Sequence, residues 1–121
     1  MQTFLKDYSD YFYFVFRVLA GLLFLLHGVQ KVFGAQPAET FSLFWFAGVI
    51  ELVVGVMVII GLWTSWAALL GAAEMVVAYI MVHIPKGLNP LSNQGELAIL
   101  YFAAFLILMT HGTKKWGLTE D

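Results

Sequence analysis

Four long apolar segments, separated by short polar stretches, set the pattern of the chain; they cover about residues 11–33, 41–62, 64–84 and 95–110. A membrane-spanning helix needs about 20 mainly apolar residues. The first three segments meet this length, and the fourth is shorter and would use its flanks. No helix is broken by a proline, because all three lie between segments: Pro37, Pro85 and Pro90.

The connections between the segments are short, with residues 34–40 after the first, a bare turn after the second and residues 85–94 after the third. Short connections make consecutive long helices antiparallel neighbours. We therefore predict one domain, residues 1–121, with an all-α fold: an integral membrane four-helix up-down-up-down bundle. Both termini then lie on one face, here called the terminal side. The connections 34–40 and 85–94 lie on the opposite face, the loop side.

Composition agrees with a membrane protein. Hydrophobic residues make up 61% of the chain, charged residues 12%, and the mean hydropathy is +0.85, whereas about half of a soluble domain is apolar and about a quarter charged. A net charge of −2 leaves no basic footprint for nucleic acid. Because the chain has no cysteine, disulfides, thiolate metal sites and dithiol redox pairs are excluded.

The chain ends and the lysines bear on orientation. The first ten residues lack a basic region, and no small-residue cleavage site follows the first apolar segment, so we interpret that segment as a retained helix and not a cleaved signal. The terminal side carries more cations than the loop side, with Lys6, Lys114 and Lys115, and Arg17 slightly inside the membrane, against Lys31 and Lys86. This bias favours cytoplasmic termini.

Two carboxylates, Glu51 and Glu74, lie near the middle of the second and third segments. A charge at the centre of a membrane helix is costly, so such residues usually face the bundle interior and serve a function. Small residues flank both acids at helical spacing: Gly48, Gly55, Ala67, Gly71 and Ala78. Small residues let helices approach closely, so we predict that both acids lie on helix-packing faces.

The first segment supplies the candidate partners. Arg17 and His27 are each ~7–8 Å from the membrane midplane, on opposite sides of it, and Lys31 shares a helix face with Arg17. We predict that Arg17 points into the bundle and pairs with one of the two acids. The other acid is then protonated, pairs with a protonated His27, or faces water. The structural alternative is that an arginine–glutamate ion pair only fixes helix register.

Other polar groups leave further options. His27 alone could be a haem or metal ligand, a proton relay or a hydrogen-bonded interior residue. Haem is disfavoured because His83 would lie ~6 Å shallower than His27, whereas axial ligands sit at matched positions. We predict no metal site. On the loop side, Lys31 and Glu96 could pair at the membrane surface, and Asn93 with Glu96 has the spacing of a helix capping box.

The polar residues also form an ordered pattern: Arg17 with Gly21; His27-Gly28 with Lys31; Glu51 with Gly55; Gly61-Leu62 with Thr64; Glu74-Met75; and Asn93 with Gly95-Glu96. In this order and spacing the chain resembles the DoxX family of small bacterial membrane proteins over nearly its whole length. The family takes its name from a subunit of an archaeal thiosulfate:quinone oxidoreductase. The resemblance implies a four-helix protein of the bacterial inner membrane with a role in quinone-linked redox chemistry, without implying thiosulfate as the substrate.

Three functions remain open from the sequence. The first is a quinone-binding or membrane-anchor subunit of an oxidoreductase, with a partner redox protein supplying electrons. The second is a small proton-coupled transporter, and the third is a non-catalytic scaffold that anchors a partner enzyme, in which the polar groups only set packing. The expected partner is a redox protein or, in a homo-oligomer, a second copy of the chain. In the first function, Arg17 or His27 donates to a quinone carbonyl and Glu51 or Glu74 supplies a proton. The candidate site is therefore Arg17, His27, Lys31, Glu51 and Glu74.

Overall fold

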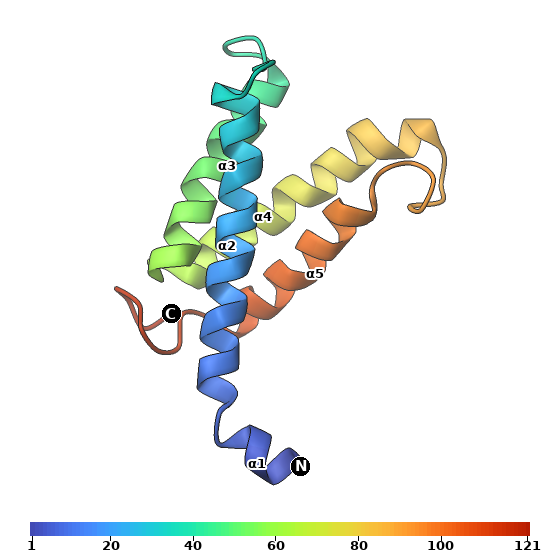
Figure 1. Ribbon diagram of the computed structural model, residues 1–121. Coiled ribbons are helices and arrows are strands. Elements are labelled where there is room, and N and C mark those ends of the chain that lie inside the picture. Colours follow the sequence, from blue (N-terminus) through green and yellow to red (C-terminus); the bar gives the residue numbers. More distant parts are fainter.

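The computed structural model describes residues 1–121, which fold entirely into helices and connecting loops (Figure 1). The elements are α1 (Gln2–Lys6), α2 (Ser9–Phe33), α3 (Leu43–Ile60), α4 (Thr64–Ala78), the π-helical turn η1 (Tyr79–His83), the 3-10 turn η2 (Ile84–Lys86) and α5 (Glu96–His111). By length and composition, three stretches can cross a membrane, namely α2, α3 and the continuous Thr64–Lys86, while α5 is a shorter apolar helix. The predicted all-α membrane fold is confirmed.

Local sequence explains where several helices begin and end. The Ser42 hydroxyl accepts a hydrogen bond from the Trp45 amide and so caps the start of α3, and Gly61 ends that helix with a φ of +68°. A positive φ suits glycine, which has no Cβ to clash. The third segment extends beyond α4 through η1, which lies just before Pro85. A proline ring clashes with the carbonyl four residues earlier in an α-helix, and a wider π-turn avoids that clash.

The predicted capping box at the start of α5 is wrong. The helix begins at Glu96 after Gly95, and no side chain caps it. Asn93 is instead fully buried in the preceding loop, where its amide nitrogen donates to the Gly87 carbonyl at 2.9 Å and its amide oxygen accepts from the Gly95 N–H at 2.8 Å. The asparagine therefore holds the loop together, and its hydrogen-bonding groups are not free to cap the helix.

The helices form two hairpins, α2 with α3 and α4 with α5, in the predicted antiparallel order. Glycine permits the close approach within the first hairpin: a Cβ on Gly28 would lie 2.7 Å from the Gly48 carbonyl oxygen, and one on Gly55 would lie 2.7 Å from the Leu25 nitrogen. In the second hairpin, a Cβ on Gly71 would lie 2.8 Å from the Phe105 ring. These contacts confirm that small residues form the packing faces.

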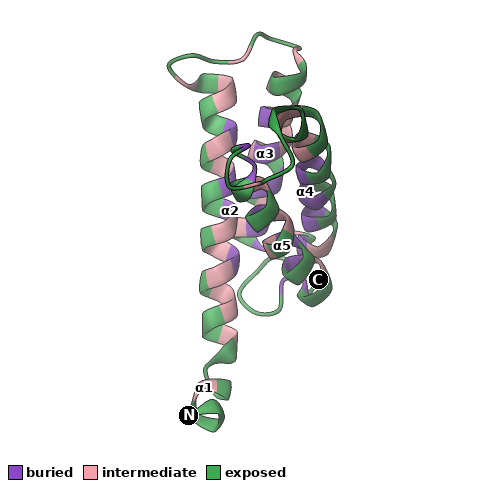
Figure 2. Ribbon diagram, turned by 90° about the vertical axis from the view of Figure 1, so that its right-hand side faces the viewer, coloured by how far each residue is buried: buried purple, intermediate pink, exposed green.

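The two hairpins lie together at the terminal side and diverge toward the loop side (Figure 1). Both chain ends lie at the end where the hairpins meet, as predicted (Figure 1). Buried residues face inward between the helices, while the outer faces are exposed (Figure 2). The core is small; it is centred on Phe24, Val54, Val58, Phe105 and Leu108. Divergence of the hairpins leaves space between α3 and α4 above this core.

Candidate functional site

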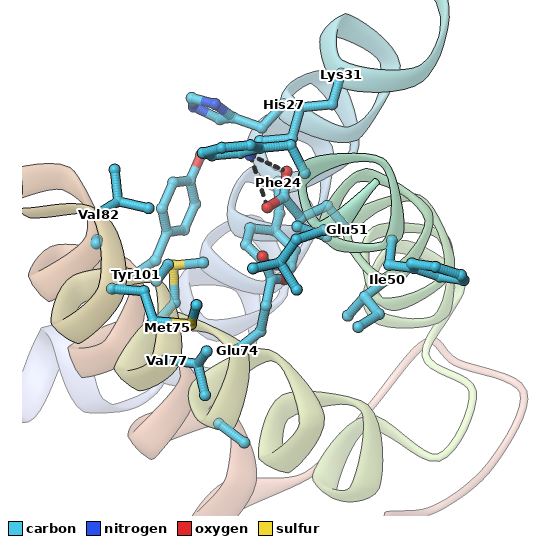
Figure 3. A pocket seen from close by; sticks show the side chains of 18 of the residues that line it. Phe24, His27, Lys31, Ile50, Glu51, Glu74, Met75, Val77, Val82 and Tyr101 are labelled. Atoms are coloured by element: carbon cyan, nitrogen blue, oxygen red, sulfur yellow. Dashed lines mark hydrogen bonds and ion pairs between the residues drawn. The ribbon is translucent and has the colours of Figure 1, made fainter. Parts of the chain in front are cut away.

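A cavity of about 590 Å³ occupies the space between the diverging hairpins. All four long helices contribute to its wall, which is mostly apolar (Figure 3). Its outer rim is made of lining side chains from α3, α4 and η1 that are themselves exposed: Leu43, Phe44, Phe46, Val77 and Met81. Because these outer faces are the surfaces that contact lipid in a membrane protein, the cavity opens sideways toward the bilayer.

Lys31 of α2 extends into the cavity, and its ammonium group forms an ion pair with Glu51 of α3 at the inner end. The ammonium nitrogen lies 2.7 Å from one carboxylate oxygen of Glu51 and 2.8 Å from the other (Figure 3). The Glu51 side chain is 1% exposed, whereas that of Lys31 is 32% exposed. A long lysine stem lets the charged group lie at a different depth from its own backbone, so Lys31 reaches from the loop side down to the buried acid.

Glu74 of α4 is the second acid of the cavity and is only 9% exposed. Both of its carboxyl oxygens are buried and accept no hydrogen bond from another residue. Its carboxyl group points toward that of Glu51 (Figure 3). The prediction that both acids point into the bundle and not at lipid is confirmed.

The charges at this inner end do not match one for one, since two acids face a single contacting cation. Two close carboxyl groups in an apolar site cannot both ionise readily, so one of them holds a proton. Glu51 is the acid that Lys31 contacts, and it is therefore the one stabilised as a carboxylate. The protonated form then falls to Glu74, and the three side chains together are electrically neutral. We call Lys31, Glu51 and Glu74 the acid cluster.

The prediction that Arg17 pairs with one of these acids is wrong. Arg17 is fully buried at the other end of the bundle and does not line the cavity. All five of its N–H groups donate to backbone carbonyl oxygens at 2.8–3.3 Å, those of Val58, Ile59, Thr113, Lys115 and Trp116. Val58 and Ile59 belong to the last turn of α3, whose unpaired carbonyls and negative dipole end attract a cation.

The other predicted partners are also placed differently. Lys31 does not pair with Glu96, which is exposed at the start of α5, because the lysine is held by Glu51. His27 lines the cavity and forms no hydrogen bond or ion pair with either acid, and its ring packs edge-on against Tyr101 with ring centroids 5.6 Å apart. His83 also lines the cavity, and its Nδ1 lies 3.1 Å from the Asn93 carbonyl oxygen.

Tyr101 and Gln94 also line the cavity, although neither is among the predicted site residues. Tyr101 is 9% exposed and comes from the middle of α5. A phenol inside an otherwise apolar membrane segment was the available signal, since a buried tyrosine normally has a use for its hydroxyl. Gln94 gave no comparable signal, because loops on the membrane surface are polar in general.

A family model described as DoxX matches residues 12–84, which include Arg17, His27 and the acid cluster. A protein of Haemophilus influenzae, named only as an uncharacterized protein, is 35% identical over 124 residues, covering 94% of this chain and 92% of the relative. No solved structure matches the chain.

Proposed function

The chain belongs to the DoxX family of small membrane proteins, and on that premise we propose that its cavity binds the head group of a membrane quinone. The protein then acts as a quinone-binding subunit of an oxidoreductase in the bacterial inner membrane. One observation carries the proposal: a cavity that opens toward lipid and is apolar along its wall ends at a buried carboxyl group with no partner.

The size and chemistry of the cavity fit such a ligand. Small-molecule sites usually measure about 300–1,000 Å³ and combine apolar walls with a few polar groups, and this cavity measures about 590 Å³. A quinone reaches its site through the bilayer, so a sideways opening suits it. Its ring can pack on the aromatic lining side chains, among them Phe24 and Tyr101.

The polar residues of the chain would orient the head group and handle protons. A quinone accepts two electrons and two protons when it is reduced. Protonated Glu74 can donate a hydrogen bond to a carbonyl oxygen and then its proton, while Lys31 holds Glu51 as a carboxylate and keeps Glu74 in the neutral form. The Tyr101 hydroxyl and the His27 ring are further donors in the same wall. Arg17 takes no part, because every N–H it has is already used.

Electrons come from a partner redox protein in this proposal, since the cavity residues include no redox-active cysteine or metal-binding cluster. The partner docks on the cytoplasmic face if the termini are cytoplasmic, as the lysine distribution favours.

Cysteine labelling tests this orientation. Because the chain has no cysteine, single cysteines at exposed Thr3 and Glu120 can be labelled with an impermeant reagent in intact cells. We expect both to be protected, and labelling of either from outside the cell would refute this orientation.

Direct binding tests the proposal. Purified protein in lipid nanodiscs is titrated with short-chain ubiquinone and menaquinone analogues, and lipids extracted from the purified protein are analysed for quinone. Ala47 lines the cavity, so Ala47→Phe should weaken binding about tenfold or more by filling it. Val53, on the same helix, is exposed and outside the cavity, and Val53→Phe is the matched control.

The outcomes separate the candidate functions. Binding by the parent and by Val53→Phe, with loss in Ala47→Phe, supports a quinone site in this cavity. Binding that Ala47→Phe leaves unchanged places the quinone elsewhere and refutes the site. Absence of quinone binding, together with solute-driven proton uptake into vesicles, would replace the proposal with a proton-coupled transporter.

A further inference from the structure

We propose that the acid cluster exchanges its proton with water only on the loop side, and that Lys31 and Glu51 form the relay to Glu74. This inference rests on the proposed function in that it concerns the same cavity, and it assigns a proton-transfer role to a residue that looks like a simple counter-ion. It follows from three features of the bundle. The terminal side is closed by packed side chains, the loop side is open to water, and Lys31 contacts Glu51 directly.

The closed end lies below the acids, toward the terminal side. There the core residues Phe24, Val54 and Phe105 fill the space between the hairpins and are at most 1% exposed. Beneath them Arg17 is fully buried and holds the end of α3 together with the chain after α5. A fixed cation repels an incoming proton, and packed apolar side chains hold no water. Protons therefore have no route to Glu74 from the terminal side.

Above the acids, on the loop side and in addition to the sideways opening, polar lining side chains gather in what we call the mouth of the cavity: His27, Lys31, His83 and Gln94. Glu51 and Glu74 are 1% and 9% exposed, so neither meets bulk water freely. Lys31 is the most exposed member of the cluster, since its side chain is 32% exposed while its nitrogen contacts both oxygens of Glu51. Through Lys31, water on the loop side can therefore exchange protons with an acid.

Titratable groups face the cluster from every helix around it: His27 and Lys31 from α2, Glu51 from α3, Glu74 from α4, His83 from η1 and Tyr101 from α5. His27 and His83 are committed to other contacts, the first packed against Tyr101 and the second beside the Asn93 carbonyl oxygen. Among these groups, Lys31 has the direct hydrogen bonds to an acid of the cluster.

The transfer balances with protons alone. After Glu74 gives its proton to a bound acceptor, a Lys31 N–H bond breaks and an O–H bond forms on Glu51. Glu51 passes that proton to the facing Glu74 carboxylate, so its own O–H bond breaks and one forms on Glu74. Neutral Lys31 then takes a proton from a hydronium ion in the water at the mouth, and that ion becomes water. Both acids and the amine return to their starting states, and one proton has moved from loop-side water to the cavity.

Hydrogen–deuterium exchange of the buried carboxyl group tests the relay without any quinone. The C=O stretch of the protonated carboxyl is followed by infrared spectroscopy while D2O replaces H2O over the parent protein in nanodiscs, and Glu74→Gln identifies the band by removing it. Lys31→Arg keeps the positive charge, but a guanidinium does not give up its proton in proteins. We expect exchange to slow about tenfold or more in this variant.

Lys86→Arg is the matched control, because Lys86 is another loop-side lysine and its nitrogen contacts Gln94 instead of the acids. Exchange in this control should equal that of the parent.

A second experiment applies if Lys31→Arg fails to fold, and it blocks the mouth of the cavity. Gln94→Cys coupled to a bulky thiol reagent should slow exchange, and Thr3→Cys coupled to the same reagent should not. The relay is overturned if exchange is unchanged by the block or by Lys31→Arg. It is also overturned if the parent shows no protonated carboxyl band.

Failure of the relay is distinct from failure of the quinone site. If Lys31-dependent exchange is present and quinone does not bind, only the proposed function is lost. If quinone binds and Lys31→Arg exchanges as fast as the parent, the relay is lost and the quinone site stands.

Discussion

The two ends of the bundle each contain a cation supplied by the same face of α2, yet the two cations are satisfied in different ways. Arg17, near the terminal side, donates to five backbone carbonyls and meets no acid. Lys31, near the loop side, meets the carboxylate of Glu51 and no carbonyl. The residues between them on that face, Gly21, Phe24 and Gly28, are buried in the bundle.

The difference shows what each end is suited to do. Five fixed N–H donors match the scattered carbonyls at the end of α3 and in the chain after α5, so the arginine closes that end completely. A lysine offers a point charge that one carboxylate can hold, and this leaves the second acid, Glu74, without a hydrogen-bond partner. The terminal end is therefore structural, and the loop end retains an unpaired polar group that a ligand can use.

Arg17→Ala should have the largest effect on stability. The substitution leaves several buried carbonyls without donors, each of which costs about 1–3 kcal/mol, and we expect a loss of about 3–5 kcal/mol in the free energy of unfolding. Arg17→Lys, with three donors in place of five, should lose roughly half as much. Unfolding in one detergent measures both, and limited proteolysis should cut the chain after His111 first. A variant as stable as the parent would contradict the structural role of Arg17.

Lys31→Met should have the next largest effect, about 2 kcal/mol, because it removes the cation beside a buried carboxylate. The loss is smaller than for Arg17 because Lys31 is partly exposed and Glu51 can take up a proton instead. The double variant Lys31→Met/Glu51→Gln has no charge left to strand and should recover most of the stability. A double variant that is less stable than Lys31→Met alone would show that Lys31 and Glu51 are not coupled in this way.

Glu51→Gln should cost only about 1 kcal/mol, a single exchanged hydrogen bond. The facing Glu74 can ionise in its place and become the partner of Lys31. Adding Glu74→Gln then removes the last acid, so the double glutamine variant should be less stable than either single one. If the stability losses of the two single variants simply add in the double variant, Glu74 cannot replace Glu51 as the partner of Lys31.

Glu74→Gln should have the smallest effect on stability, within about 0.5 kcal/mol. Glu74 has no hydrogen-bond partner in the parent, and the amide of glutamine keeps the shape of the protonated acid without adding a charge. The same change should weaken quinone binding or impair turnover in the complex, since it removes the proton. Full activity of this variant in the assembled oxidoreductase would exclude Glu74 as the proton donor.

Apolar segment lengths and short connections predicted the membrane fold well, because membrane length and backbone hydrogen bonding leave few alternatives. The inward direction of Glu51 and Glu74 followed from the cost of exposing charge to lipid. The hydrogen-bond partners of Arg17 and of the two acids could not be predicted in the same way. Counting charges matched Arg17 to an acid, but backbone carbonyls carry no sequence signal, and the chain after Gly112 turns back under α3 to provide three of them.

Lys31 was placed at the surface for a related reason. Its backbone lies near the end of α2, and its flexible stem allowed a reach that residue depth alone does not predict. The cavity itself depends on the angle between two hairpins. That angle arises from the sum of many side-chain contacts, and no single motif encodes it.

The number of protonated carboxyl groups at neutral pH tests the acid cluster most directly, and infrared difference spectroscopy of variants in nanodiscs measures it. A neutral acid cluster requires one such group in the parent and none in Glu74→Gln. It also requires none in Glu51→Gln, because Glu74 then ionises against Lys31, and two in Lys31→Met, because both acids become neutral. A band that persists in both glutamine variants, or a count that Lys31→Met does not raise, would contradict a neutral cluster of one lysine, two acids and one shared proton.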